Sequence, residues 1–328
     1  MSEAFIIVGS DHRPAEQVAS PRLTLETAVG GDVLVRTEIL GQSVLQRLAV
    51  ELKKAEFDEI SFYGDSLLSS EANESSGASH LLSAWESVAG RLRQSADKSG
   101  DRPVLIFELS AYLELDFADL LRLHQESGKA VTRVLDEAGP IGLWVVNPAI
   151  FPEIVEIRSV IDQISGAEYC TSGYINRLET PGDLRRLVND GLASRCQCRP
   201  QGFEVKPGIW MAPGANVEKA ARIVAPAFIG RDVNIGDDCL ITRGSNVESN
   251  SEVDYGTTIE SSSILSNTYV GIGLDLSHSI VQGSHLLNLQ HDVVLHISDP
   301  AVMRQNKKLV AADPRSLPNF GIGEAMAT

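Results

Sequence analysis

An aliphatic residue stands at every sixth position between residues 217 and 259, and this series consists of Val217, Ile223, Ile229, Ile235, Ile241, Val247, Val253 and Ile259. A period of six fits neither an α-helix nor a simple two-faced strand. It is typical of a parallel β-helix, in which short strands stack coil upon coil and each buries an inward side chain. The series therefore predicts a β-helix over residues 209–298.

The preceding part of the chain alternates short apolar runs with helical patterns, which is typical of an α/β domain with a largely parallel sheet. Strands are predicted at residues 5–8, 60–63, 104–107 and 143–146, and a helix between residues 42 and 55. Asp116 is a suitable N-cap for a further helix. Thr180 and Pro181 open another, because threonine caps a helix and proline fits its first position.

These patterns predict an α/β domain over residues 1–192, a polar linker over 193–208, the β-helix over 209–298, and a cap with a loose tail over 299–328. The linker holds Cys196 and Cys198 with no second cysteine pair nearby. We therefore expect reduced structural thiols there rather than a zinc site.

Composition and net charge exclude some classes of function. The chain has 328 residues, enough for two domains with full cores, and a net charge of −16. Without an excess of Lys and Arg we expect no nucleic-acid partner. The apolar run near the N-terminus follows no basic cluster, and no stretch approaches the roughly 20 apolar residues that span a bilayer, so we expect a cytoplasmic protein without membrane insertion.

Four segments carry a resemblance to a known family. The sequence 39–48 (ILGQSVLQRL) is similar to a "G-x-P-x-L-x-x-x-L" motif, 57–60 (FDEI) to "V-D-E-I", 142–148 (GLWVVNP) to "G-I-Y-x-x-x-P", and 173–183 (GYINRLETPGD) to "G-Y-W-x-D-I-G-T-P-E-D". Together with the domain order, they resemble the nucleotide-sugar pyrophosphorylases, which are sugar-1-phosphate nucleotidyltransferases. The resemblance implies an α/β nucleotidyltransferase-like domain, GT-A-like and Rossmann-like, followed by a left-handed parallel β-helix of hexapeptide repeats.

The chemistry-bearing positions of that family differ here. Nucleotidyl transfer needs a glycine-rich loop for the triphosphate and carboxylates that hold a divalent ion. After the first predicted strand this chain has the single glycine Gly9, then Asp11, and Arg13 is either a stand-in for the family's loop arginine or an ordinary surface residue.

Both metal positions also lack their carboxylate. The first falls on Ser110, a poor ligand for a hard cation, unless Glu108 or Glu114 reaches inward instead of being solvated at the strand end. The second falls on Arg177, which inverts the local charge. The family's sugar-phosphate lysine motif has no counterpart between residues 133 and 141.

The leading hypothesis is therefore a degenerate member of the family, a non-catalytic binding, regulatory or scaffolding component of nucleotide-sugar or cell-surface polysaccharide biosynthesis. It requires no cofactor, and its expected partners are a nucleotide or nucleotide-sugar, another protein, or further copies of the chain. Its vestigial pocket would comprise Gly9, Arg13, Glu108, Ser110, Gly142 and Arg177.

Two alternatives stay open. One is an active sugar-1-phosphate nucleotidyltransferase, of the guanylyl- or thymidylyltransferase type, with relocated Mg²⁺ ligands. The other is a hexapeptide-repeat acyltransferase that uses a histidine between neighbouring coils, and the candidates are His278, His285, His291 and His296.

Overall fold

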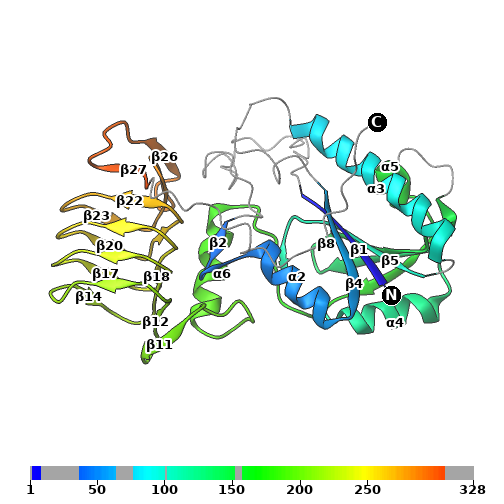
Figure 1. The fold of residues 1–328 in the computed structure, drawn as a ribbon, viewed down its shortest axis with the longest axis horizontal. Helices are drawn as coiled ribbons and strands as arrows, with labels where there is room; N and C mark the ends of the chain where they lie inside the picture. The colour runs from blue at the N-terminus through cyan, green and yellow to red at the C-terminus, as the bar shows by residue number, and fades with distance from the viewer. Residues whose placement is uncertain (1, 9–36, 64–76, 100–101, 152–156, 307–328) are drawn as a thin grey trace. The chain divides into compact units, whose positions relative to one another are not determined.

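The computed structural model describes residues 2–8, 37–63, 77–99, 102–151 and 157–306. The chain forms two compact units (Figure 1). One contains the described residues of 2–8 and 48–175, and the other those of 37–47 and 176–306. The predicted α/β domain ended at residue 192, after the last helix, whereas the division falls before that helix. The fold is mixed α/β with parallel strands in both units.

The first unit is built on a six-stranded sheet with the order β4-β1-β5-β8-β7-β9. Its strands are β1 (Ser2–Ile7), β4 (Phe57–Tyr63), β5 (Val104–Glu108), β7 (Val131–Asp136), β8 (Gly139–Val146) and β9 (Ala167–Cys170). Strand β1 runs parallel to β4 and β5, but β8 is antiparallel to both β5 and β7. The sheet is thus mixed rather than largely parallel, because periodicity shows that a strand exists but not its direction.

The remaining elements of this unit are β6 (Tyr112–Leu113), α3 (Gly77–Ser99), α4 (Phe117–Ser127), η3 (Pro148–Ile150) and α5 (Ile157–Ile161). Helix α3 buries one face against β1, β5 and β8, where Trp85 meets Trp144 edge to face at 5.9 Å. Figure 1 shows α3 and α4 on opposite sides of the sheet. The chain passes between the units within α2 (Val44–Lys54) and within β10 (Ile175–Asn176).

Both predicted helix starts are confirmed. The Asp116 side chain accepts a hydrogen bond from Asp119 N at 3.0 Å, as an N-cap does. Helix α6 (Pro181–Leu192) opens with a capping box, in which Thr180 Oγ1 accepts from Asp183 N and Asp183 Oδ2 accepts from Thr180 N.

The second unit begins with β2 (Glu38–Ile39), β3 (Gln42–Ser43) and α6, and continues as stacked strands. An eight-stranded sheet has the order β11-β12-β15-β18-β21-β24-β25-β26, a five-stranded sheet β13-β16-β19-β22-β27, and a four-stranded sheet β14-β17-β20-β23. Successive strands from β12 to β24 visit the three sheets in turn. This strand order is consistent with a parallel β-helix with three strands per coil.

The strands of the eight-stranded sheet are β11 (Phe203–Lys206), β12 (Ile209–Met211), β15 (Ala227–Ile229), β18 (Ser245–Val247), β21 (Ser263–Ile264), β24 (Ser279–Gln282), β25 (His285–Asn288) and β26 (Val293–His296). Those of the five-stranded sheet are β13 (Asn216–Val217), β16 (Asn234–Ile235), β19 (Glu252–Val253), β22 (Thr268–Val270) and β27 (Met303–Gln305). The four-stranded sheet consists of β14 (Arg222–Ile223), β17 (Leu240–Thr242), β20 (Thr258–Glu260) and β23 (Asp275–Ser277).

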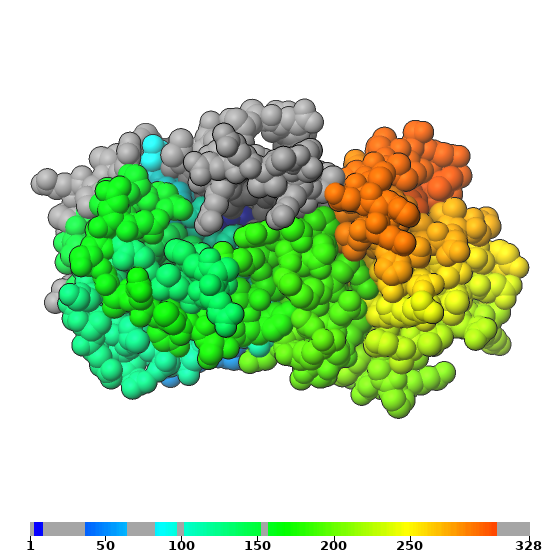
Figure 2. Space-filling model, turned by 180° about the vertical axis from the view of Figure 1, so that it is seen from behind, coloured from blue at the N-terminus to red at the C-terminus, as the bar shows by residue number. Residues whose placement is uncertain are grey.

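The aliphatic series of the sequence forms the core of these coils. Ile229, Ile235, Ile241, Val247, Val253 and Ile259 are buried in one cluster, and Val217 and Ile223 pack against it. The core continues beyond the regular series through Ile264, Val270, Leu276 and Val281, with a shorter step at Ile259–Ile264 and again at Leu276–Val281. In the space-filling view the coils appear as successive bands from green to orange (Figure 2).

Serine hydroxyls of successive coils stabilise the corners of the coils by hydrogen bonds to the backbone. Ser245 Oγ donates to Ile259 O and accepts from Ser262 N, and Ser262 Oγ in turn accepts from Ser279 N at 2.9 Å. These buried hydroxyls bond to backbone groups that the corner would otherwise leave unpaired.

The parallel coils end earlier than residue 298. Strand β25 pairs with β24 and with β26 in antiparallel fashion, and β27 is antiparallel to β22. Residues 285–305 therefore close the stack with reversed strands, and the parallel coils expected up to residue 298 stop at Gln282. Reversed strands give the last coil hydrogen-bonding partners, which parallel coils alone would not supply.

The segment predicted as a linker is packed in part. Cys196 and Cys198 are buried thiols, and Gln201 N donates to Leu40 O at 2.9 Å, whereas residues 203–206 are exposed. Within the described residues, no helix has the length and apolar character needed to cross a membrane.

Candidate functional site

The parallel strands β1, β4 and β5 end side by side. Val8 N donates to Tyr63 O at 2.7 Å, and Leu109 N donates to Ile7 O at 2.9 Å. In open α/β sheets, ligands bind outside the carboxyl ends of the strands. Glu108 is the last residue of β5 and therefore lies at such an end.

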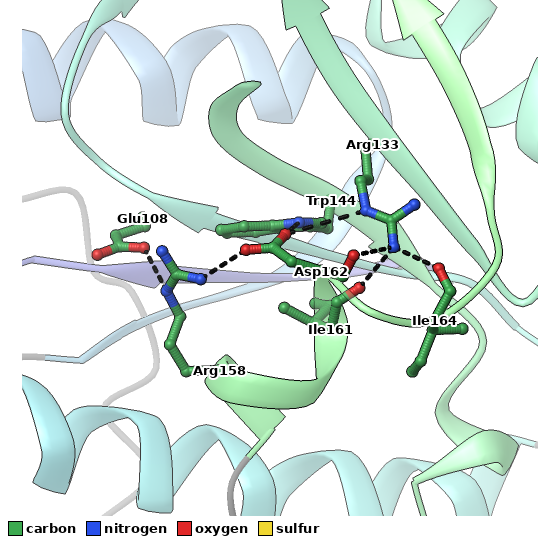
Figure 3. Close-up of polar contacts among 7 residues, drawn as sticks. All are labelled: Glu108, Arg133, Trp144, Arg158, Ile161, Asp162 and Ile164. Carbon is green, nitrogen blue, oxygen red and sulfur yellow. Dashed lines mark hydrogen bonds and ion pairs between the residues drawn. The ribbon is translucent and has the colours of Figure 1, made fainter. Parts of the chain in front are cut away.

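Glu108 is buried, and its carboxylate forms an ion pair with Arg158 of helix α5 (Figure 3). Arg158 Nε lies 3.1 Å from Glu108 Oε2. From the sequence, Glu108 either reaches inward or is solvated at the strand end. The prediction of a solvated side chain is wrong, because the Glu108 side chain is buried. Its charge is matched by a guanidinium within the same unit.

Two tryptophans and a second carboxylate hold Arg158 in place. Its guanidinium carbon lies 5.4 Å from the Trp144 ring centre and 5.9 Å from that of Trp85, within cation–π range. Arg158 Nη1 donates to Asp162 Oδ2 at 2.8 Å, and Asp162 Oδ1 accepts from Trp144 Nε1 at 3.0 Å. The pair at Glu108 is therefore one end of a connected polar network.

Arg133 fixes the other end of this network (Figure 3). Its Nη2 donates to the backbone carbonyls of Ile161, Asp162 and Ile164, at 3.0 Å and 2.8 Å for the first two. These carbonyls end helix α5, where a cation is electrostatically favoured. No sequence pattern indicated this role, because α5 is too short for a periodic pattern.

The structure brings Glu108, Ser110 and Gly142 together. Gly142 has φ of +73°, and a Cβ there would lie 3.2 Å from Glu108 O and 3.9 Å from Ser110 Oγ. Only glycine adopts this backbone conformation without strain. Ser110 is exposed, so its hydroxyl is open to a ligand beside the buried ion pair.

For the other three predicted pocket residues the structure gives no placement at the end of β5. Gly9 and Arg13 lie outside the described residues. Arg177 follows β10, is half-buried and belongs to the second unit.

The donor set at the end of β5 does not fit Mg²⁺. A hard cation needs several oxygen ligands with available charge, whereas the Glu108 carboxylate is paired with Arg158 and Ser110 is neutral. Glu114 accepts a hydrogen bond from the Tyr112 hydroxyl at 2.9 Å. Among the residues that the structure describes, no group of three or more His, Cys, Asp or Glu side chains is arranged to hold a metal ion.

The second unit holds a buried polar cluster that the sequence analysis missed. Glu248 is fully buried; its Oε1 accepts from Leu40 N at 2.8 Å and from Asn246 Nδ2 at 2.6 Å, and its Oε2 accepts from Gly41 N at 2.9 Å. Burial raises the pKa of Glu248 to about 8, and the charge of Glu38 adds to the increase, while the three N–H donors oppose it. The carboxylate binds the β2–β3 turn to the outside of β18.

Arg185 of α6 completes this cluster. Its Nη1 donates to Asn246 Oδ1 at 3.0 Å and to Ser263 Oγ at 2.8 Å, and its Nη2 donates to Gly244 O at 2.8 Å. Burial lowers the pKa of this guanidinium to about 10. Through these contacts the cluster holds α6 against Gly244, Asn246 and Ser263 of the coils. Its residues are not contiguous in the sequence, so no sequence motif would reveal it.

Three of the four candidate histidines lie in the antiparallel closing strands and their turn rather than between parallel coils. His285 and His296 lie opposite each other on the antiparallel strands β25 and β26. His278 occupies a coil corner with φ of +48°, and His291 lies in the turn between β25 and β26.

No protein-family model matches the chain, and no curated protein matches it. The solved structures that are similar to it include two of HddC from Yersinia pseudotuberculosis. The complex with GMP-PN has 12% sequence identity and a TM-score of 0.38, with 57% of this chain and 97% of that chain covered. The other has 11% identity with the same coverage and TM-score.

Proposed function

We propose that the chain is a degenerate relative of the nucleotide-sugar pyrophosphorylases that binds a nucleotide or nucleotide-sugar without transferring a nucleotidyl group. It would act as a regulatory or scaffolding component of nucleotide-sugar or cell-surface polysaccharide biosynthesis. The observation that carries the proposal is the ion pair between Glu108 and Arg158 at the end of β5.

Catalysis in this class depends on a divalent ion that neutralises charge on the transferring group. The end of β5 presents a carboxylate already matched by arginine, next to an exposed serine hydroxyl. A guanidinium is also a suitable partner for phosphate oxygens, because its planar donors match their geometry. Arg158 is paired with Glu108 and Asp162, so an anionic ligand would bind here by taking over some of its donors, while a metal would find the Glu108 carboxylate already paired.

A two-part experiment tests the proposal. Pyrophosphate release is measured with each nucleoside triphosphate, common sugar 1-phosphates and Mg²⁺, and the expected rate is that of the background. Turnover that disappears on chelation would contradict the non-catalytic assignment and favour the active-enzyme alternative.

The second part is calorimetric titration of nucleotides and nucleotide-sugars in the presence of EDTA. Binding should survive chelation and weaken in Arg158→Gln, while Arg122→Gln, on the exposed face of α4, should bind like the parent protein. Absence of binding by every compound tested would contradict the ligand-binding assignment.

The proposal also includes a left-handed direction for the coils and self-association of the chain. The exposed side chains of Tyr255 and Ile272 support the second point, since they occupy the same corner of consecutive coils and Gly273 N donates to Tyr255 O at 2.9 Å. Multi-angle light scattering measures the mass in solution, and a strict monomer would contradict self-association.

A further inference from the structure

A row of ligand-type side chains crosses the end of the eight-stranded sheet. Gln282 on β24 lies opposite His285 on β25, and His285 lies opposite His296 on β26. Directly opposite residues of antiparallel strands project from the same face. Val281 and Leu286 point to the opposite face, into the core of the coils. The row therefore lies on the outer surface of the sheet. The adjacent residues Val281 and Leu286 hold the same strands against the core.

The two imidazole rings lie close enough together to bind one ion. Their centres are 4.9 Å apart, and their planes are inclined by 49°. An imidazole nitrogen binds zinc at about 2.0–2.1 Å, which puts each ring centre roughly 3 Å from the ion and two tetrahedral ligands' rings roughly 5 Å apart. The observed separation agrees with this value.

Ser284 precedes His285 in the chain and Gln282 lies opposite His285, and each carries a side-chain oxygen. Ser284 Oγ lies 3.4 Å from His296 Nδ1. Gln282 Oε1 is enclosed by protein and accepts no hydrogen bond among the described residues, although a buried amide oxygen normally does. An ion bound in the row would give this oxygen the partner that it otherwise lacks.

We propose that His285 and His296 form a binding site for a borderline transition-metal cation of the Zn²⁺, Ni²⁺ or Cu²⁺ class, with Gln282 Oε1 as a further donor. Imidazole nitrogen is a preferred ligand for these ions. The ion joins β25 to β26 and stabilises the reversed strands that close the coil stack.

The test uses the untagged full chain freed of metal with EDTA. Calorimetric titration with Zn²⁺ should show one ion bound per chain. His285→Ala and His296→Ala should each weaken binding by roughly tenfold or more, which corresponds to about 1.4 kcal/mol. His291→Ala, at an exposed histidine outside the row, is the matched control and should bind as the parent does. Equal affinity in all four proteins, or no binding to the parent, would overturn the proposal.

A spectroscopic measurement covers the case in which a histidine variant fails to fold. Cu²⁺ added to the parent protein in equimolar amount should give an electron paramagnetic resonance spectrum with superhyperfine splitting from two imidazole nitrogens. A spectrum with fewer imidazole nitrogens, or with thiolate ligation, would overturn the proposal. Gln282→Leu should retain both nitrogen couplings and weaken Zn²⁺ binding, and unchanged affinity would remove Gln282 from the ligand set.

Discussion

Asn246 Nδ2 donates a 2.6 Å hydrogen bond to Glu248 Oε1, two residues further along the chain, and so connects a buried carboxyl group to a buried guanidinium. The other end of the carboxamide, Oδ1, accepts from Arg185 at 3.0 Å. The Glu248 carboxyl group and the Arg185 guanidinium are thus bridged by Asn246 rather than in direct contact. A connected buried network of this kind favours one arrangement of its elements, because a displaced member leaves polar atoms unpaired.

Glu248 should make the stability of the protein depend on pH. Its folded-state pKa of about 8 is above the ordinary 4.5, so the folded chain retains a proton that the unfolded chain loses. The associated stability is fully present below about pH 4.5 and is lost as the pH rises through 8. Chemical denaturation of Glu248→Gln between pH 5 and 8.5 should show a smaller decrease with pH than the parent. An identical slope would contradict the raised pKa.

Arg185→Met should destabilise the protein by about 2 kcal/mol, because hydrogen bonds to a charged donor are worth roughly 1.5–3 kcal/mol and Gly244 O loses its guanidinium partner. Arg186→Met is the control, since Arg186 is exposed and pairs only with Asp183 at the surface among the contacts described. Its effect should be within about 0.5 kcal/mol. Equal effects in the two variants, measured by urea denaturation, would show that the α6 cluster contributes little.

Ile235→Asp should unfold the coils, because it puts an unpaired charge into the buried aliphatic core at a cost of several kcal/mol. Asn234 is the neighbouring position, half-buried and opposite Glu252, so aspartate there would add like charges across the strands. The neutral Asn234→Thr is therefore the better control and should melt close to the parent. Circular dichroism melting curves compare the three proteins, and a parental curve for Ile235→Asp would contradict the assigned inward register.

Arg158→Met should destabilise the first unit by about 1–3 kcal/mol, less than the 3–5 kcal/mol of a fully buried pair because Arg158 is about one-third exposed. It leaves the Glu108 carboxylate buried without this partner. The double variant Glu108→Leu, Arg158→Met should recover part of the loss, because the unpaired charge is removed as well. Additive losses in the double-mutant cycle would mean that the two side chains do not interact.

The sequence predicted those elements whose pattern is local and repeated. Asp116 and Thr180 marked helix starts because a capping side chain and the amide it serves are three residues apart. The Ile235 series marked the coils because each inward position needs an aliphatic residue. The antiparallel direction of β8 and the antiparallel strands after Gln282 could not be predicted from the sequence. The spacing of apolar residues is the same whichever way a strand runs.

The candidate sites were predictable only in part. The motif resemblance led to Glu108, Ser110 and Gly142, which the structure places together. It did not reveal Arg158, which lies far along the chain from Glu108 and only meets it through the packing of α5. Asn246 and Glu248 appeared as ordinary polar residues beside Val247, because what covers the outer face of a coil is decided by tertiary contacts.

The shorter step after Ile259 means that successive coils are not interchangeable. Pairing places Thr242 opposite Glu260 but Asn246 opposite Ser263, so the corner between them has one residue fewer in the later coil. The extra residue of the earlier corner is Gly244, with φ of +73°, and its carbonyl accepts from Arg185. The contact of Arg185 with Gly244 therefore suits helix α6 to this coil, and sliding the helix by one coil toward residues 261–262 would leave its arginine facing a corner that lacks the matching carbonyl.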